Sequence, residues 1–224
     1  LEHGGIFNDV NVNRVFVDAD ELVGKDDLAP FFENIDGILI PGGFGERGTE
    51  GKILAAGYAR RNRIPFFGIC LGMQLAVTEF SRSLCSLTSA NSKEFDPDTP
   101  DPVIDYLPGQ KNITRKGGTM RLGAYECTIE PGTNAMRAYG TDRISERHRH
   151  RYEFNPAYEE RLTQAGLIIS GRNPESGLVE IVELPDHPWF LGCQFHPEFK
   201  SKPMQAHPLF RDFIMKSLEY RRQR

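Results

Sequence analysis

The sequence predicts an α/β fold built on a mostly parallel β-sheet, with some antiparallel strands in its second half. Two observations support this fold class. Through residues 1–90, short apolar runs alternate with helical stretches, and this β-α-β order is typical of a parallel sheet. Beyond residue 116, short apolar runs follow one another with turn residues between them, which makes the second half richer in strand.

The first half opens with glycines at positions 4 and 5, where we expect a helix that began further upstream to end. After them, each β-branched or aromatic run indicates a strand, and each longer run of helix-forming residues a helix. The elements expected here are strands at residues 12–17, 37–40 and 64–69 and helices at residues 52–61 and 73–81.

Residues 91–116 are rich in Pro, Asp, Gly and Lys, and we expect long surface loops there around one short strand. The elements expected after them are strands at residues 119–130, 144–154, 167–171, 179–183 and 189–195 and a closing helix at residues 209–220. The chain has no internal repeat, linker or low-complexity tract, so we expect residues 1–224 to form one domain.

Composition and charge narrow the possible partners. The 224 residues are 39% hydrophobic, and 27 Lys and Arg against 31 Asp and Glu give a net charge of −4, which argues against a nucleic-acid partner. No apolar run is long enough to span a membrane, and residues 1–20 carry charges where a signal peptide would be apolar, so we expect a cytoplasmic protein with no membrane partner. Four widely spaced cysteines without a C-x-x-C pair predict reduced thiols and no zinc site.

Cys70 is the most informative residue of the chain. The apolar run before it ends in Gly68-Ile69-Cys70, Leu71-Gly72 follow, and a helical stretch begins, which is typical of a nucleophile elbow. Glycines on both sides would allow close backbone approach, and the helix N-terminus would favour a thiolate and any oxyanion beside it. A buried structural cysteine is the alternative, because cysteine is often buried, but the flanking glycines favour the elbow.

A glycine-rich loop follows the strand at residues 37–40. Gly43-x-Gly45-x-x-Gly48 formally matches a dinucleotide fingerprint, yet the acidic residue that should end the next strand is absent. Loops after neighbouring parallel strands share one edge of a sheet. We therefore expect backbone N–H groups near Gly43 to face the sulfur of Cys70 across a small substrate and to form half of an oxyanion hole.

His196 is the best candidate for the base that a cysteine nucleophile needs. It follows the apolar run at residues 189–195, and at strand spacing His196 and Glu198 would project to the same side, with Pro197 marking the end of the strand. The carboxylate would then orient the imidazole. A plain turn after an edge strand is the alternative.

Residues 146–152 alternate charged and imidazole side chains. At strand period Arg147, Arg149 and Arg151 would share one face and His148 and His150 the other. A solvated face is the simplest interpretation, and a carboxylate or phosphate site is the alternative. The two histidines lack a third metal ligand at a sensible spacing, so we expect no metal site.

Taken together, these motifs resemble the glutaminase domain of the CTP synthases, a class I glutamine amidotransferase domain. Pro-Gly-Gly-Phe-Gly at 41–45, Gly-Ile-Cys-Leu-Gly-Met-Gln at 68–74 and His-Pro-Glu-Phe at 196–199 resemble the three core motifs of the class. The stretches at 90–95, 117–123 and 146–153 resemble CTP synthases in particular. The resemblance implies a flavodoxin-like sheet with helices on both faces.

The resemblance also implies roles for individual residues. Cys70, His196 and Glu198 would form a catalytic triad that hydrolyses L-glutamine to glutamate and ammonia through a cysteine thioester, with N–H groups of Gly43 and Leu71 as the oxyanion hole. Residues implied to bind L-glutamine are Gly43, Phe44, Leu71, Gly72, Met73, Gln74, Glu94 and Arg151. Glu94 would bind the ammonium of the substrate, and Phe44 would cover its stem.

In this family the ammonia aminates UTP to CTP in an amidoligase domain that binds ATP, UTP and Mg²⁺, with GTP as an allosteric activator. That N-terminal domain is absent from these 224 residues. The resemblance implies no cofactor or metal in the glutaminase domain itself, and a full-length enzyme that assembles as a homo-oligomer, a tetramer. A γ-glutamyl hydrolase or cysteine peptidase on the same fold is the nearest alternative, and a binding domain without catalysis is another.

Overall fold

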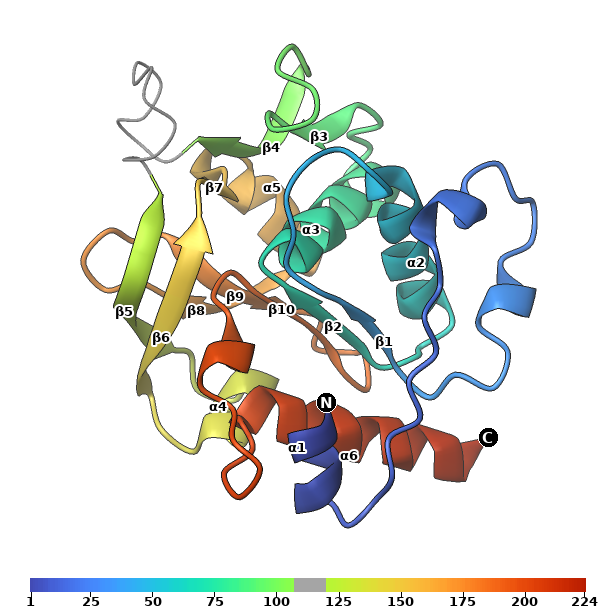
Figure 1. Cartoon of the computed structure of the whole chain (residues 1–224). Coiled ribbons are helices and arrows are strands. Elements are labelled where there is room, and N and C mark those ends of the chain that lie inside the picture. The colour runs from blue at the N-terminus through green and yellow to red at the C-terminus, as the bar shows by residue number, and fades with distance from the viewer. Residues whose placement is uncertain (107–119) are drawn as a thin grey trace.

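The structure is a computed structural model that describes residues 1–106 and 120–224. A seven-stranded sheet forms the middle layer, with α2 (Thr49–Arg61) and α3 (Leu71–Leu84) on one face (Figure 1). On the other face lie α1 (Glu2–Phe7), α4 (Asn134–Tyr139) and α6 (Pro208–Gln223) (Figure 1). The predicted α/β class, with helices on both faces of the sheet, is confirmed.

The sheet joins a parallel half to an antiparallel half. Its order is β1-β2-β10-β9-β8-β5-β6, in which β1, β2 and β10 run parallel and each later neighbour is antiparallel. A second sheet has the order β3-β4-β7. The strands are β1 Ile38–Ile40, β2 Phe66–Ile69, β3 Ala90–Ser92, β4 Asp101–Tyr106, β5 Arg121–Ile129, β6 Arg143–His150, β7 Tyr152–Phe154, β8 Ile168–Arg172, β9 Val179–Glu183 and β10 Phe190–Cys193, and α5 spans Glu159–Gln164.

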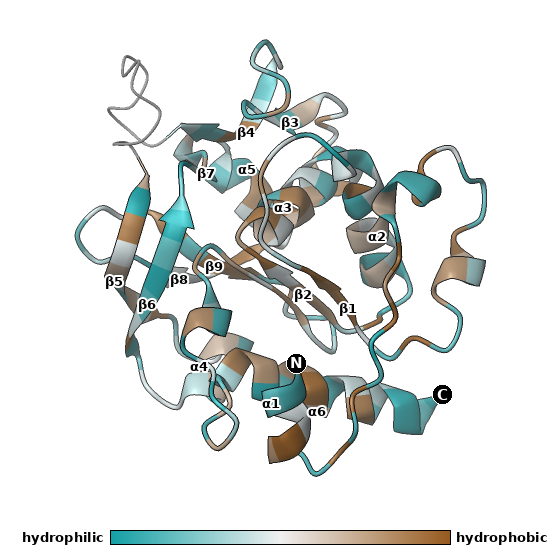
Figure 2. Ribbon diagram, viewed as in Figure 1, coloured by the Kyte–Doolittle hydropathy of each residue, from teal (hydrophilic) through white to brown (hydrophobic). Residues whose placement is uncertain are grey.

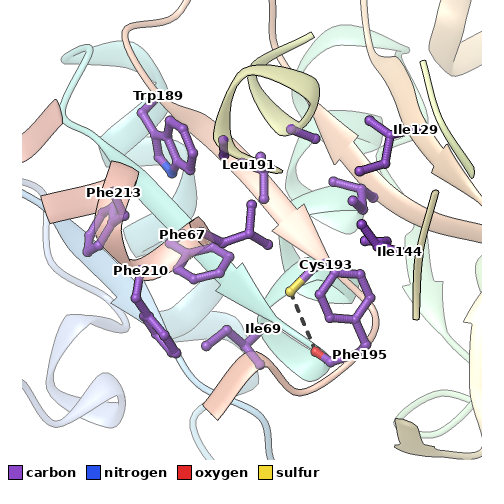
Figure 3. Packing of buried hydrophobic residues seen from close by; sticks show 14 of the residues in the cluster. Phe67, Ile69, Ile129, Ile144, Trp189, Leu191, Cys193, Phe195, Phe210 and Phe213 are labelled. Carbon is purple, nitrogen blue, oxygen red and sulfur yellow. Dashed lines mark hydrogen bonds between the residues drawn. The ribbon is translucent and has the colours of Figure 1, made fainter. Parts of the chain in front are cut away.

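Strand alternation divides the core between the two faces of the sheet. Phe66 packs with the alanines of α2 and stacks on Phe190, with ring centroids 4.5 Å apart, whereas its neighbour Phe67 points to the opposite face. There Phe67 packs against Phe210 and Phe213 of α6 (Figure 3). The parallel strands β2 and β10 contain only apolar residues and glycine, as the colour of β2 shows (Figure 2), because strands covered on both faces lose their polar alternation.

The prediction of a strand at residues 12–17 is wrong. These residues have no strand pairing, and Phe16 is 89% exposed. The segment runs beside β1, which is the edge strand of the sheet. A cavity of about 990 Å³ separates the segment from β1 and α6, and its lining includes Val15, Val17, Leu39 and Phe213. A strand needs hydrogen bonds to a neighbour, and β propensity alone does not supply one.

The prediction that the first helix ends at its glycines is also wrong. Gly4 and Gly5 lie inside α1, which continues to Phe7. A Cβ on Gly4 would lie 2.6 Å from the carbonyl oxygen of Phe210, so the glycine is needed for α1 to approach α6 closely. Tertiary packing therefore explains a residue that the sequence pattern assigns to a helix end.

Other differences concern boundaries. The helices α2, α3 and α6 extend beyond their predicted ends, and β10 is shorter than residues 189–195. The run at 144–154 splits at Arg151 into β6 and β7, which belong to different sheets. Within residues 91–106 the structure has two short strand segments, β3 and β4, where one strand was expected. The loops predicted at residues 107–116, and the start of the strand predicted at residue 119, lie outside the described residues. In the described part of the chain no helix is both long enough and apolar enough to cross a membrane.

Candidate active site

The turn from β2 to α3 holds Cys70 in a strained conformation. Cys70 is the single residue between the two elements, and its φ of 49° and ψ of −102° lie in a region that non-glycine residues rarely adopt. Such a conformation costs about 1–3 kcal/mol, which the surrounding packing must offset. The Cys70 N–H donates to the carbonyl of Cys193 at 2.7 Å, so β10 anchors the turn. The sulfur is thereby fixed at the N-terminus of α3.

Two glycines allow the elements around this turn to pack closely. A Cβ on Gly72 would lie 2.1 Å from the carbonyl oxygen of Ile40, and one on Gly68 would lie 2.6 Å from the backbone of Gly72. Side chains at these positions would push β1 and β2 away from α3. The glycines that flank Cys70 are therefore required by close backbone approach, as expected.

His196 is held by contacts on several sides. Its N–H donates to the carbonyl of Arg147 in β6 at 2.8 Å, and its ring stacks on Phe199 with centroids 4.9 Å apart. Its Nδ1 lies 2.7 Å from Oε1 of Glu198, whereas its Nε2 is buried and has no hydrogen-bond partner among the described residues. A carboxylate accepts hydrogen bonds, so Nδ1–H is the donor and Nε2 is left with a lone pair in the neutral ring.

The prediction that strand spacing brings His196 and Glu198 together is wrong, although the two side chains do contact each other. β10 ends at Cys193, and Glu198 lies in the 3₁₀ helix η4 (Pro197–Phe199), whose N-cap is His196. Proline suits the first position of a helix because its φ is fixed and it lacks an N–H. The pair therefore forms through a helical turn and does not rest on strand alternation.

Gly42, in the loop after β1, lies against both catalytic candidates. A Cβ on Gly42 would be 2.8 Å from Cε1 of His196 and 3.5 Å from Cβ of Cys70. The two side chains thus face the same point of the backbone, and any side chain at position 42 would displace the imidazole. The structure brings Cys70 and the His196–Glu198 pair together from two separate parts of the chain, beside the loop after β1.

Burial dominates the electrostatics of the nucleophile. Burial raises the pKa of the Cys70 thiol to about 12. The N–H of Leu71 lowers this pKa, whereas the charges of Glu198, Glu153 and Glu94 raise it further. The expectation that the helix N-terminus would favour a thiolate is therefore outweighed. Proton transfer from sulfur needs a neighbouring base, and the unpartnered Nε2 of His196 is suited to that role.

The glycine-rich loop lies beside Glu94 and Leu71. The Gly45 N–H donates to Oε1 of Glu94 at 3.1 Å, and a Cβ on Gly43 would lie 3.2 Å from Cδ2 of Leu71. Burial raises the pKa of Glu94, while the Gly45 hydrogen bond and the charge of Arg151 lower it. The loop, the segment after β3 and the break between β6 and β7 therefore meet on one side of Cys70.

The other residues expected to bind glutamine differ in whether their side chains are exposed to a ligand. Phe44 is 59% exposed, and the guanidinium carbon of Arg149 lies 5.8 Å from the centroid of its ring. Met73 is fully buried in the core and packs against Gly192, so only its backbone can contact a ligand. Gln74 is buried as well, and its amide nitrogen donates to the carbonyl of Tyr152 at 3.0 Å.

Sequence reasoning missed Gln194. Its side chain is fully buried, and Nε2 lies 3.8 Å from Sγ of Cys70, within the range of hydrogen bonds to sulfur. The only signal in the sequence is a glutamine inside the apolar run at residues 189–195. A polar residue in such a run is an exception to the burial of apolar side chains, and it points to a specific partner.

Sequence reasoning placed His148 and His150 on one face but missed the buried group of ionisable side chains to which they belong, which lies between the antiparallel half of the main sheet and β7. Its members, hereafter the Arg121 cluster, are Arg121, Glu153, Glu180, His148 and His150. Arg121 lies 2.6 Å from Glu180 and 3.5 Å from Glu153, and His148 Nδ1 lies 2.8 Å from His150 Nε2. Burial raises the pKa of Glu180 to about 7 and lowers the pKa values of His148 and His150 to about 2 and 3.

The alternation predicted for residues 146–152 is confirmed as far as His150, whereas Arg151, which was expected on the face of Arg147 and Arg149, lies in the break between β6 and β7. Arg147 and Arg149 are exposed, whereas His148 and His150 are buried on the opposite face. The histidines contact carboxylates of the Arg121 cluster, with His148 3.5 Å from Glu180 and His150 3.4 Å from Glu153. Among the described residues no group of three or more His, Cys, Asp or Glu side chains is arranged to hold a metal ion.

Comparison with known families agrees with this geometry. The family model of the class-I glutamine amidotransferases matches residues 3–216, and the chain belongs to this family. The curated relatives narrow the class further. The chain is 60% identical over its whole length to the CTP synthase of Syntrophus aciditrophicus, and 60% identical over 96% of its length to that of Moorella thermoacetica. It spans about 41% and 40% of the lengths of these two relatives.

Solved structures show the same relationship. The glutaminase domain of Trypanosoma brucei CTPS, solved with bound acivicin, has 41% sequence identity and a TM-score of 0.92, and the match covers 97% of this chain and 85% of that one. A putative GMP synthase protein from Thermoplasma acidophilum, at 15% identity and a TM-score of 0.61, shares the fold, and the match covers 99% of this chain and 89% of that one. The chain is similar throughout to the glutaminase part of CTP synthases.

Proposed function

We propose that residues 1–224 act as one glutaminase unit that hydrolyses L-glutamine to glutamate and ammonia. The observation that supports this most is the convergence of a strained cysteine, an imidazole with an unpartnered Nε2 and a carboxylate on its Nδ1. Family membership supports the same reaction. No metal or cofactor takes part in the steps proposed for this unit.

The first half-reaction would form a thioester. Nε2 of His196 takes the proton of Cys70, and the sulfur attacks the side-chain amide carbon of glutamine. N–H groups of Gly43 and Leu71 stabilise the oxyanion, and the contact between Gly43 and the side chain of Leu71 supports this role. His196 then donates its proton to the amide nitrogen, the C–N bond breaks and ammonia leaves.

The second half-reaction would release glutamate. His196, oriented by Glu198, removes a proton from water, and the resulting hydroxide attacks the thioester carbon. The C–S bond breaks, glutamate leaves, and the sulfur regains a proton from His196. The sulfur is thus the nucleophile of the first step and the leaving group of the second.

Recognition of free glutamine would rest on groups around the glycine-rich loop. Glu94 binds the ammonium of the substrate, Arg151 its carboxylate, and Phe44 covers its stem. Gly43, Leu71, Gly72 and Met73 contribute backbone contacts, because the side chain of Met73 is committed to the core. Both N–H bonds of Gln74 are directed at protein acceptors, so its carbonyl oxygen is the group left for the substrate.

Within the longer protein we propose that the ammonia aminates UTP to CTP in an amidoligase domain. That domain would use ATP, UTP and Mg²⁺, respond to GTP, and assemble with copies of itself as a tetramer. The similarity to CTP synthases and the fraction of their length that the chain spans support this assignment. ATP and UTP are cytoplasmic metabolites, so a cytoplasmic location belongs to the same proposal.

Labelling with an electrophilic glutamine analogue tests the proposal. The chain is treated with and without excess L-glutamine, and the modified cysteine is found by peptide mapping. We expect one adduct, on Cys70, that glutamine suppresses and a γ-glutamyl peptide does not. Protection by the peptide alone would favour a γ-glutamyl hydrolase or peptidase. Labelling spread over Cys85, Cys127 and Cys193 would contradict a formed glutaminase site.

A further inference from the structure

Gln194 lies between the nucleophile and the first turns of α3. It follows β10, its side chain is fully buried, and its N–H donates to the carbonyl of Glu180 at 2.8 Å. Its amide contacts Sγ of Cys70 at 3.8 Å on one side and the amide of Gln74 at 3.3 Å on the other. The residue therefore bridges a reacting atom and a buried polar side chain.

A backbone carbonyl determines which way both amides point. The carbonyl of Tyr152 can only accept, so the group of Gln74 that faces it at 3.0 Å must be the NH₂. The same NH₂ lies 3.3 Å from the Gln194 side chain, which must present its oxygen there. The NH₂ of Gln194 is then the end directed at Sγ of Cys70. The series of hydrogen bonds therefore makes the NH₂ of Gln194 a donor to the sulfur of Cys70.

A donor at this place acts differently on the two forms of the sulfur. A thiolate is a much stronger acceptor than a thiol, so a fixed N–H stabilises the charged form selectively. The site is otherwise unfavourable to that charge, because the sulfur is buried and the carboxylates of Glu198 and Glu94 act against it. Apart from Gln194, the backbone N–H of Leu71 is the donor that favours the thiolate.

We propose that Gln194 is a catalytic residue that stabilises and positions the Cys70 thiolate, and that Gln74 is a positioning residue that fixes the orientation of the Gln194 amide. This inference rests on the proposed function, in which the sulfur attacks in one step and leaves in the next. The donor lowers the barrier to both steps because the sulfur carries negative charge in each. Its effect on the sulfur itself can be measured without glutamine.

The test measures the rate at which iodoacetamide alkylates Cys70 as a function of pH, by peptide mapping. Gln194→Met removes the donor at similar volume, and Gln194→Glu keeps an oxygen for Gln74 but loses the NH₂. We expect alkylation at pH 7.5 to slow about tenfold in both variants, with the pH midpoint moved upward by about one unit. Gln164→Met, an exposed glutamine of α5, is the matched control and should match the parent chain.

Gln74→Met separates positioning from donation. It leaves Gln194 in place but removes the group that fixes its amide, so we expect a smaller shift of the midpoint in the same direction. Unchanged alkylation profiles in folded Gln194→Met and Gln194→Glu would overturn the proposal. Glutamine hydrolysis is measured in parallel. A parent chain with no hydrolysis but a Gln194-dependent profile would contradict the glutaminase function and the catalytic role of Gln194, but would support its hydrogen bond to the Cys70 thiolate.

A second measurement covers the case in which the Gln194 variants fail to fold. The side-chain ¹⁵NH₂ signals of Gln194 are followed by NMR in the parent chain while Cys70 is titrated, and in the Cys70→Ala variant. We expect the Gln194 signals to move with the ionisation of Cys70 and to be insensitive to pH in Cys70→Ala. Signals that are the same in both proteins across the titration would show that Gln194 only fills space.

Discussion

Two groups of histidine and carboxylate lie at the two halves of the main sheet, and they differ in burial and in which nitrogen atoms have a partner. The carboxylates of the Arg121 cluster are buried, whereas the Glu198 side chain is 43% exposed. In the Arg121 cluster the imidazoles contact each other, and each has a carboxylate within 3.5 Å. In the Cys70 group the Nδ1 of His196 is paired, whereas its Nε2 has no partner among the described residues. Residue types alone would not distinguish them, whereas the uncommitted nitrogen beside a strained cysteine does.

The comparison also concerns charge. The Arg121 cluster holds two carboxylates against one guanidinium, and burial raises the pKa values of Glu153 and Glu180 while keeping His148 and His150 neutral. Burial raises the pKa of Cys70 in the same way. Burial thus disfavours charge in both groups, whereas the proposed reaction requires a charge on the sulfur of Cys70. That difference explains why donors are directed at the sulfur.

The largest effect is expected from Cys70→Ala. Loss of the nucleophile should reduce glutamine hydrolysis at least about 10³-fold, measured by glutamate release, because no other group can form the thioester. The melting temperature should change little, since the substitution removes only one small sulfur atom from the packing. Cys85→Ala, which alters a buried cysteine at the far end of α3, should retain hydrolysis. Turnover at the parent rate in Cys70→Ala would contradict the assignment of the nucleophile.

Replacing one carboxylate by an amide in each of the two groups tests whether only the Cys70 group takes part in catalysis. Glu198→Gln keeps an acceptor oxygen but removes the negative charge beside Nδ1 of His196, and we expect kcat to fall about 10²-fold at unchanged stability. Glu153→Gln should leave kcat within about twofold, because a neutral amide resembles the protonated carboxyl that burial favours there. Steady-state kinetics on both variants decides. A larger loss of kcat in Glu153→Gln than in Glu198→Gln would reverse the roles of the two groups.

A smaller effect is expected at the far end of the substrate site. Glu94→Ala should raise KM for glutamine about tenfold and change kcat less, because the lost contact lies away from the reacting amide. The variant also frees the N–H of Gly45, so Glu94→Gln, which keeps an acceptor for it, is the control for loop structure. A fall in kcat with constant KM would place Glu94 in the chemical steps.

The smallest effect concerns pH and the Arg121 cluster. The pKa of His150 is lowered from 6.5 to about 3, so its contribution to stability is present above pH 6.5 and is lost as the pH falls below it. Glu180, whose pKa is raised to about 7, acts in the opposite direction between pH 4.5 and 7. His150→Gln removes the contribution of His150 to this pH dependence. Between pH 7 and pH 5, the free energy of unfolding of the variant should therefore fall less than that of the parent chain, by a difference of about 2 kcal/mol.

Urea unfolding at the two pH values measures this difference. His3→Gln is the matched control, because His3 is only half-buried and its ring contacts Ser201, which lies outside the cluster. The control should show the pH dependence of the parent chain. Equal pH dependence in His150→Gln and the parent chain would mean that His150 is charged, or absent from the buried network, in the folded protein.

The α/β class and the strained turn at Cys70 could be predicted from local sequence. The glycines around Cys70 and the His-Pro-Glu motif depend on local backbone requirements, which a short stretch of sequence carries by itself. Cys70, His196 and Glu198 could therefore be singled out from their local motifs alone. The way His196 and Glu198 meet could not, because the end of β10 is set by its pairing with β2 and β9.

Features that depend on partners distant in the chain could not be predicted from the sequence. Residues 12–17 have strand-forming side chains but no strand beside them, so they stay unpaired along the cavity at β1. Gln194, Gln74 and the carbonyl of Tyr152 meet from three separate parts of the chain, and no spacing in the sequence encodes that contact. Hydrogen bonds and burial depend on distance in space, and local pattern fixes only which side chains are available to make them.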